Sequence, residues 1–347
     1  MALRTAVASV LTGVMLPWAL SAGPRRDRDR LGFYRDLAAT RDPDTAFPAP
    51  PPGVEVSSAG SGGLESRRRA ARVDLLRFES PFVAANPAVR EEYARFARNG
   101  TAWAQHWRHA DGPRPTLCVI HGFGASPYWF NRAFFALPSF FHHGYDILLY
   151  TLPFHGPRRS KLAPVNGAEL FGSGLAHLNE GIGQGVHDFR VLIDYLQASG
   201  VERIAVTGLS LGGYVSALLA AVEDRLDLVI PIAPVVSMVP LMRQWFPASL
   251  LFAAVSRAHG ISPQDAESAL AVHCPLTYEP VVPNERLMII GGLGDRLAPP
   301  EQAQMLWEHW GRPRLHWFSG SHMVHASRAA YLREIRGFMQ ATGFTHA

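Results

Sequence analysis

A serine between glycines lies in the stretch VTGLSLGGYVS, residues 206–216, and raises the question of a nucleophile. Ser210 has Gly208 two residues before it and Gly212 two residues after it. This spacing suits a sharp strand-to-helix turn, in which the hydroxyl is exposed and the flanking residues must be small. Because glycine-rich chains match such a pattern by chance, the elements and partner residues around it must support it. The alternative is a helix-start serine that caps the helix.

A serine hydroxyl needs a base to become a nucleophile, and the base needs an acid to orient it. The stretch GLGDRLAPP places Asp295 just after an apolar run, and the next such run ends at His322. The order Ser, Asp, His, with each residue after a strand, is a known order for a triad. We therefore predict Ser210 as nucleophile, His322 as base and Asp295 as acid. His325 is the second candidate base, and Glu301 is a weaker acid because a helix start favours a negative charge for structural reasons.

Acyl transfer by a serine also needs backbone N–H groups that stabilise an oxyanion. One donor is the residue after the nucleophile, and the other lies in the loop after an earlier strand. The residues HGFG, 121–124, close such a strand. The predicted donors are therefore the N–H groups of Leu211 and Phe123. We interpret His121 itself as structural, because the two glycines alone explain the turn.

The elements that would position these residues are short apolar runs that alternate with helical patterns. Runs that are apolar on both faces are typical of central strands in a parallel sheet covered by helices. The alternation predicts an α/β protein with a mostly parallel, doubly wound sheet and helices on both faces. Ligands of such sheets bind beyond the carboxyl ends of the strands. The predicted strands lie within 116–124, 145–156, 203–210, 226–236, 286–295 and 314–322, and the predicted helices within 180–198, 211–223, 299–310 and 327–341.

The motifs HGFG, GLSLGG, GLGDRLAPP and GSH, in this order, resemble the α/β-hydrolase superfamily over about residues 70–345. The segments PFHGPRRS, HLNEG and IPIAPVVS are more loosely similar to a little-described branch that contains animal abhydrolase domain-containing proteins. The resemblance implies the α/β-hydrolase fold and a Ser-His-Asp triad. It does not fix the substrate, because esterases, lipases, thioesterases, peptidases and acyltransferases share these parts.

A long segment after the strand that ends near residue 236 predicts a small helical cap over about 237–285. This segment is rich in large apolar side chains, and an apolar cap over a serine nucleophile favours a substrate with a hydrophobic acyl chain. The alternative is that these side chains only pack the segment onto the sheet. The predicted substrate-binding residues are Trp245 and Phe246 in the cap and Trp129 beyond the oxyanion loop.

Together these residues predict a serine hydrolase of carboxylic esters that prefers apolar acyl groups and takes a small-molecule ester as its partner. An acyltransferase or a thioesterase on the same fold is the first alternative. A non-catalytic binding protein on a hydrolase scaffold is the second, and a fluorophosphonate probe separates it from an enzyme. Arg158 and Arg159 follow a strand at the same edge, where they either hold an anionic group of the substrate or lie in a solvated loop.

The charge distribution argues against nucleic acid as a partner. Of the ionisable residues, 11 arginines and 7 acids lie in residues 1–72, and the remaining 22 basic and 22 acidic residues balance each other. The formal net charge of +4 thus comes from the N-terminal arm, whose arginine clusters RRDRDR, 25–30, and SRRR, 66–69, we interpret as solvated linker. Cys118 and Cys274 lie too far apart to suggest a framework of disulfides. No metal or cofactor is predicted, because the other histidines lack metal-ligand spacing: His142, His143 and His155.

The N-terminal arm contains an apolar segment and a linker. Residues 5–20 carry no charge, and the small residues before Ala22 fit a signal-peptide cleavage site. The arginines after Gly23 oppose export of the rest of the chain. We therefore predict a cytoplasmic or peripheral membrane protein whose residues 1–21 contact a membrane interface or the domain, with export by a signal peptide as the alternative. Residues 43–63 are rich in Pro, Gly and Ser and predict an extended linker, which divides the chain into an arm, 1–69, and a hydrolase domain, 70–347.

Overall fold

The computed structural model describes residues 24–60, 71–245 and 248–345. Our prediction for residues 1–21 and the predicted boundary at residue 69 lie outside the described residues. Within the described part of the chain, no helix is long and apolar enough to cross a bilayer.

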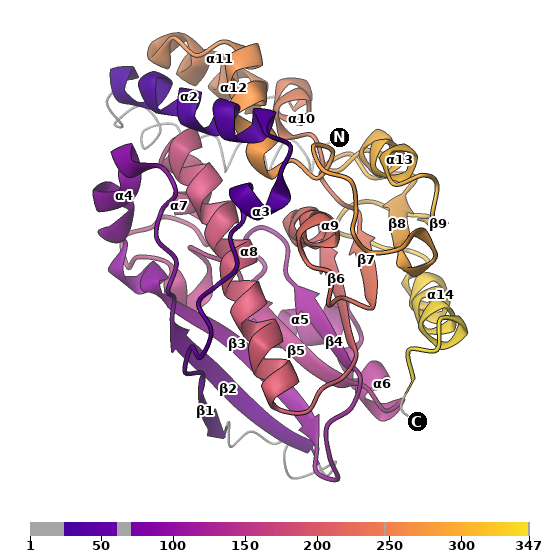
Figure 1. Cartoon of the computed structure of the whole chain (residues 1–347). Coiled ribbons are helices and arrows are strands. Elements are labelled where there is room, and N and C mark those ends of the chain that lie inside the picture. Colours follow the sequence, from indigo (N-terminus) through magenta and orange to yellow (C-terminus); the bar gives the residue numbers. More distant parts are fainter. Residues whose placement is uncertain (1–23, 61–70, 246–247, 346–347) are drawn as a thin grey trace.

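The core is a nine-stranded sheet in the order β1-β2-β3-β5-β4-β6-β7-β8-β9 (Figure 1). The strands from β5 to β9 in this order pair in parallel, and β1, β2 and β3 extend the sheet as antiparallel strands. The predicted doubly wound, mostly parallel sheet is confirmed. The strands are β1 (Ser57–Gly60), β2 (Ala71–Glu79), β3 (Thr101–His109), β4 (Thr116–Ile120), β5 (Asp146–Thr151), β6 (Ile204–Leu209), β7 (Leu228–Ile232), β8 (Met288–Gly292) and β9 (Arg314–Phe318).

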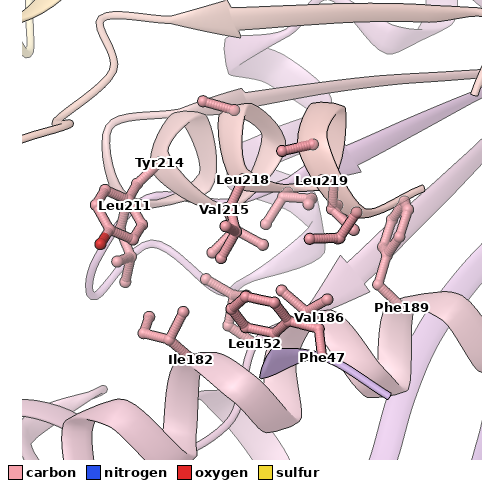
Figure 2. Close-up of a cluster of buried hydrophobic side chains, with 14 of the residues drawn as sticks. Phe47, Leu152, Ile182, Val186, Phe189, Leu211, Tyr214, Val215, Leu218 and Leu219 are labelled. Carbon is pink, nitrogen blue, oxygen red and sulfur yellow. The ribbon is translucent and has the colours of Figure 1, made fainter. Parts of the chain in front are cut away.

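Helices cover both faces of the sheet, as the apolar strands require. Each residue of the central strands β4 to β8 is buried. On one face, α8 (Leu175–Ala198) and α9 (Leu211–Val222) pack together with α13 (Pro300–His309). On the other face lie α5 (Tyr128–Phe134), α6 (Leu137–His142) and α14 (Arg328–Ala341). Figure 2 shows the apolar contact between α8 and α9, to which these side chains contribute: Phe47, Leu152, Ile182, Val186, Phe189, Leu211, Tyr214, Val215, Leu218 and Leu219.

Two features differ from the linker predicted over residues 43–63. The structure has a short helix, α3 (Pro43–Ala46), and the edge strand β1 within this range. The helix begins there because the Asp42 side chain accepts a hydrogen bond from the Asp44 N–H and a proline holds the first helical position. The Phe47 side chain is then buried, with its ring centroid 6.1 Å from that of Tyr278. Residues 43–46 and 57–60 thus have regular structure, whereas the described residues between them lie in neither a helix nor a strand.

A layer of helices lies over one end of the molecule. The helix α2 (Pro24–Ala39) lies beside α11 (Ala248–His259) and α12 (Pro263–Leu270), with α10 (Met238–Gln244) next to them (Figure 1). Leu31, Tyr34 and Ala38 of α2 are buried in the main core. The remaining helical segments between the strands are α4 (Pro87–Ala94), α7 (Ala168–Gly172) and the short 3₁₀ turns η1 (Ala97–Gly100), η2 (Gly156–Arg158), η3 (Ala271–His273) and η4 (Asn284–Arg286).

Several histidines of the fold are buried as neutral rings. Burial lowers the pKa of His106 to about 3, with the nearby Arg108 acting in the same direction. Burial likewise lowers the pKa of His273 to about 3 and that of His121 to about 4. Since an unfolded histidine has a pKa of about 6.5, the unfolded chain binds more protons than the folded chain between these values. The fold therefore has its full stability, with respect to these histidines, above about pH 6.5 and loses stability progressively as the pH falls from there towards the folded pKa.

We expect the free energy of unfolding to fall steeply as the pH is lowered from 6.5 to 4.5, because each such histidine adds about 1.4 kcal/mol per pH unit to the slope. Urea unfolding at a series of pH values measures this slope. His106→Phe should reduce the slope by about one proton, since it removes one of the buried rings. An unchanged slope in this variant would show that His106 has the same pKa in both states.

Candidate active site

Ser210 occupies the sharp turn between β6 and α9. Its backbone has φ 57° and ψ −109°, a conformation that residues other than glycine rarely adopt. The Ser210 N–H donates to Ile232 O at 3.0 Å, and Ser210 O accepts from the Tyr214 N–H at 2.8 Å, so both sides of the turn are fixed. The Ser210 side chain makes no capping hydrogen bond to α9. A strained serine that does not cap its helix is what a nucleophile turn requires, and the capping alternative is not supported.

The glycines around Ser210 are required by close backbone contacts. A Cβ atom on Gly208 would clash with the Gly212 carbonyl, and one on Gly212 would clash with the Ile120 carbonyl. The turn is therefore packed against the end of β4. This crowding is the physical reason for small residues two positions before and two positions after the serine.

Asp295 and His322 lie in contact at the ends of β8 and β9. His322 Nδ1 and Asp295 Oδ2 are 2.6 Å apart, and both side chains are buried. The other carboxylate oxygen, Asp295 Oδ1, accepts the N–H groups of Leu297 at 2.8 Å and Ala298 at 2.9 Å. These bonds satisfy the buried carboxylate and fix its orientation. With Nδ1–H donating to Asp295, the Nε2 atom of His322 is left to accept a proton.

The structure places Ser210 at the same edge of the sheet as this pair, because all three residues follow parallel strands. Among the described residues, the Ser210 hydroxyl has no hydrogen bond to His322. Catalytic hydrogen bonds are often long before substrate is bound, so the geometry is compatible with a proton transfer that tightens on binding.

His325, the second candidate base, has both ring nitrogens engaged. Nδ1 lies 2.9 Å from the Tyr331 hydroxyl, and Nε2 lies 3.1 Å from the His322 carbonyl oxygen. The ring stacks on Phe318 with centroids 4.1 Å apart. Burial lowers the pKa of His325 to about 4. These contacts indicate that His325 supports the loop that carries His322 rather than serving as a base.

The loop after β4 lies against the nucleophile turn. A Cβ atom built on Gly122 would be 3.7 Å from Ser210 Cβ. His121 Nε2 accepts the Leu152 N–H at 3.1 Å, so the proton of the neutral ring is on Nδ1, which donates to Gly122 O at 2.8 Å. The Gly122 carbonyl therefore points towards His121, and the N–H of Phe123 in the same trans peptide points the opposite way.

The two predicted oxyanion donors are both available. Among the described residues, neither the Phe123 N–H nor the Leu211 N–H has an acceptor. The Leu211 N–H lies in the first turn of α9, where backbone N–H groups have no partner within the helix. His121 has the structural contacts that the sequence favoured for it.

Asn166 is a site residue that the sequence did not reveal. Its Nδ2 donates to Gly124 O at 2.9 Å and to Ser126 Oγ at 2.7 Å, and its Oδ1 accepts the Gly156 N–H at 2.7 Å. It thus joins the segment after β5 to the oxyanion loop. No motif or periodicity marks an asparagine for this role, because its partners in the oxyanion loop, Gly124 and Ser126, lie far from it in the sequence.

The predicted substrate-binding residues are not in one cluster of contacts. Trp129 is 73 % exposed at the start of α5. Trp245 follows α10 and is half-buried, and its Nε1 is buried without a hydrogen-bond partner in the described part of the chain. Phe246 lies outside the described residues. The helices α10, α11 and α12 are where the cap was predicted.

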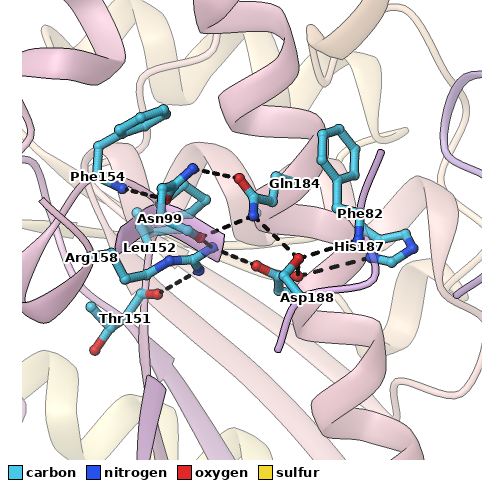
Figure 3. A network of polar contacts seen from close by, with 12 residues as sticks. Phe82, Asn99, Thr151, Leu152, Phe154, Arg158, Gln184, His187 and Asp188 are labelled. Carbon is cyan, nitrogen blue, oxygen red and sulfur yellow. Dashed lines mark hydrogen bonds and ion pairs between the residues drawn. The ribbon is translucent and has the colours of Figure 1, made fainter. Parts of the chain in front are cut away.

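Arg158 differs from our prediction. Its side chain is fully buried, and Nη2 donates to Asp188 Oδ2 at 2.7 Å and to Asn99 O at 2.8 Å (Figure 3). The interpretations as a substrate-binding arginine and as part of a solvated loop are therefore both wrong for Arg158. The physical reason is the buried Asp188 carboxylate, which needs a cation as its partner and is paired with the Arg158 guanidinium.

We expect Arg158→Ala to lower the free energy of unfolding by about 3–5 kcal/mol, because it would leave the Asp188 carboxylate buried and unpaired. The half-buried neighbour Arg159, whose side chain makes no hydrogen bond or ion pair among the described residues, provides the matched control. Arg159→Ala should change stability by no more than about 0.5 kcal/mol. Urea unfolding of the two variants measures the difference, and equal losses would contradict the assignment.

Within the described residues, no three His, Cys, Asp or Glu side chains gather in a way that would hold a metal ion. The same edge of the sheet brings together a strained serine, a histidine in contact with an aspartate, and two backbone N–H groups that have no acceptor among the described residues.

Comparison with known proteins agrees with this architecture. A family model for the alpha/beta hydrolase fold matches residues 115–255. An uncharacterized protein of Mycobacterium tuberculosis, matched in two strains, is 31% identical over 326 residues, which cover 90% of this chain and 72% of that protein. The chain belongs to the α/β-hydrolase superfamily.

Solved structures show the same fold at low sequence identity. An acetyl xylan esterase from a Paenibacillus species aligns with a TM-score of 0.59 at 12% identity, over 93% of this chain and 98% of that chain. Acetyl xylan esterase 1 from a Thermoanaerobacterium species aligns with a TM-score of 0.59 at 13% identity, over 93% and 97%. The acylaminoacyl peptidase of Pyrococcus horikoshii aligns with a TM-score of 0.51 at 14% identity, over 80% of this chain and 42% of that chain.

Proposed function

We propose that this protein is a serine hydrolase of carboxylic esters. The observation that carries the proposal is the buried 2.6 Å contact between His322 and Asp295 at the strand edge where Ser210 holds its strained turn. Two structures with the same fold are esterases by name, which supports the reaction class. Superfamily membership alone does not select this chemistry.

In the proposed reaction, Ser210 Oγ attacks the ester carbonyl carbon while His322 Nε2 takes the hydroxyl proton. The negative oxygen of the tetrahedral intermediate accepts hydrogen bonds from the N–H groups of Phe123 and Leu211. His322 then gives its proton to the leaving alcohol, and an acyl-enzyme remains. Asp295 stays ionised and stabilises the imidazolium.

Water completes the cycle. His322 Nε2 takes a proton from the water as its oxygen attacks the acyl-enzyme, and the second tetrahedral intermediate uses the same two N–H groups. The intermediate collapses to the carboxylic acid as His322 returns the proton to Ser210 Oγ. A fluorophosphonate probe tests the assignment directly, because it labels a serine only where the base and the oxyanion donors activate it. Labelling of the wild type at Ser210 supports the proposal, and failure to label refutes it.

Exposed apolar side chains around the site support a substrate with an apolar acyl group. Soluble proteins seldom gather such side chains without a use. Among the described residues, the large apolar side chains that follow the parallel strands and are at least half exposed are Trp129 after β4, Leu162 after β5, Leu250 and Val281 after β7, Leu293 after β8, and Met323 and Val324 after β9. Their positions suit a site whose entrance contacts hydrocarbon.

We expect kcat/KM for p-nitrophenyl esters to rise with acyl length. Each buried methylene contributes about 0.8 kcal/mol, which corresponds to roughly fourfold per carbon until the pocket is full. Trp245→Ala should flatten this dependence and keep acetyl-ester turnover, since the triad is untouched. Val83→Ala, an exposed apolar position before α4, is the control and should leave the dependence unchanged. Acetate as the best acyl group of the wild type would refute the apolar preference.

A further inference from the structure

A cavity lies among the helices of the cap, and neither Ser210 nor His322 lines it. It has a volume of about 410 Å³ and opens between α10, α11 and the start of α12. Phe252 and Ile261 provide apolar surface, and Ser256 provides a hydroxyl. The guanidinium-bearing side chains that line it are Arg243 of α10 and Arg257 of α11, both exposed and thus reachable from solvent.

A third arginine lies at the edge of this cavity. Arg28 of α2 approaches Gly260, with Nη1 3.9 Å from the position of a Cβ atom on that glycine. Among the described residues, Arg28, Arg243 and Arg257 form no ion pair. The nearby carboxylate of Asp265 is engaged in the cap of α12, where it accepts from the Ser262 N–H at 3.0 Å and the Ser262 hydroxyl at 2.7 Å. The cavity therefore has an excess of positive charge beside an apolar surface.

We propose that this cap cavity binds an amphipathic anion, with its carboxylate or phosphate between Arg243 and Arg257 and its chain against Phe252 and Ile261. Guanidinium groups bind both oxyanions through paired N–H donors, which explains the two arginines without carboxylate partners. The volume suits a short chain or the first part of a longer one. This binding is separate from ester hydrolysis and does not depend on the proposed function.

Isothermal titration of the full chain with octyl phosphate, octanoate and octanol tests the proposal. Both anions should bind at least about tenfold more tightly than octanol, since octanol has the chain without the charge. Arg243→Gln combined with Arg257→Gln should remove this advantage. Ala253→Phe, which fills the cavity and keeps both arginines, should also weaken binding of the anions. Arg333→Gln, on the exposed side of α14, is the control for the loss of an arginine outside the cavity and should bind as the wild type does.

A vesicle experiment distinguishes a lipid headgroup in a membrane from a free amphiphile as the source of the anion. Sedimentation with phosphatidylglycerol vesicles that depends on the two arginines, without binding of octyl phosphate, identifies a lipid headgroup as the ligand. Binding of the soluble anions identifies a free amphiphile. Binding of the anions that is equal in the wild type and in the double variant, or no binding in either experiment, would overturn the proposal.

Discussion

Ser210→Ala is expected to lower kcat for ester hydrolysis by at least about 10³-fold, because the hydroxyl forms a covalent bond that no neighbouring group replaces. The fold should survive, since the Ser210 side chain makes no capping hydrogen bond. Steady-state rates with a p-nitrophenyl ester, together with the far-UV circular dichroism spectrum, measure both effects. An unchanged rate would contradict the assignment of the nucleophile.

A second substitution at this position separates a nucleophile turn from an ordinary helix start. Ser210→Gly should be as inactive as Ser210→Ala and more stable than the wild type by about 1 kcal/mol, because glycine adopts a φ of 57° without strain. A helix-capping serine would behave in the opposite way, since its loss destabilises the helix. The matched control is Ser216→Ala, which removes a hydroxyl bonded to Gly212 O in the same helix and should lower kcat by less than about tenfold.

The parallel strands of the sheet were predictable because their buried residues form short apolar runs in the sequence. The runs around Val119 and Val206 are apolar at consecutive positions, and only a strand covered on both faces has that composition. The strands β2 and β3 were not predicted, since they include arginine, histidine and acidic residues among their apolar ones. These strands are held by the pairing of β2 with β3 and of β3 with β5, which the local sequence pattern does not indicate.

The sequence of α2 contains an apolar pattern that indicates its packing against the domain. Leu31, Tyr34 and Ala38 recur at spacings of three and four residues and are buried, and they are the buried side chains among residues 28–39 of this helix. The high arginine content around them favoured a solvated interpretation instead. Charged residues on the outer face of an amphipathic helix are compatible with both interpretations, so composition alone does not separate them.

Some polar contacts of the site were predictable from the sequence, and others depend on how distant segments pack. The proximity of Asp295 and His322 was predictable because each residue follows an apolar run, and the sheet brings such positions to one edge. The contacts of Arg158 with Asp188 and of Asn166 with Gly124 depend on how separate segments pack, and neither residue lies in a motif that names its partner. Sequence patterns therefore predicted the residues that we propose as reacting groups, and the structure shows which groups hold their loops.

His322 and His325 lie in the same loop, and the proposed base predicts different effects on kcat when each is replaced by alanine. His322→Ala should lower kcat by about 10³-fold or more, because Ser210 would lose the ring that Asp295 orients as its base. His325→Ala should lower kcat by less than about tenfold and mainly reduce stability, since it removes contacts to Tyr331 and to the His322 carbonyl. Steady-state kinetics, and partial rescue of His322→Ala by added imidazole, provide the measurement. A large loss of kcat in His325→Ala with a small loss in His322→Ala would move the base three residues along and leave the buried contact between His322 and Asp295 as a structural one.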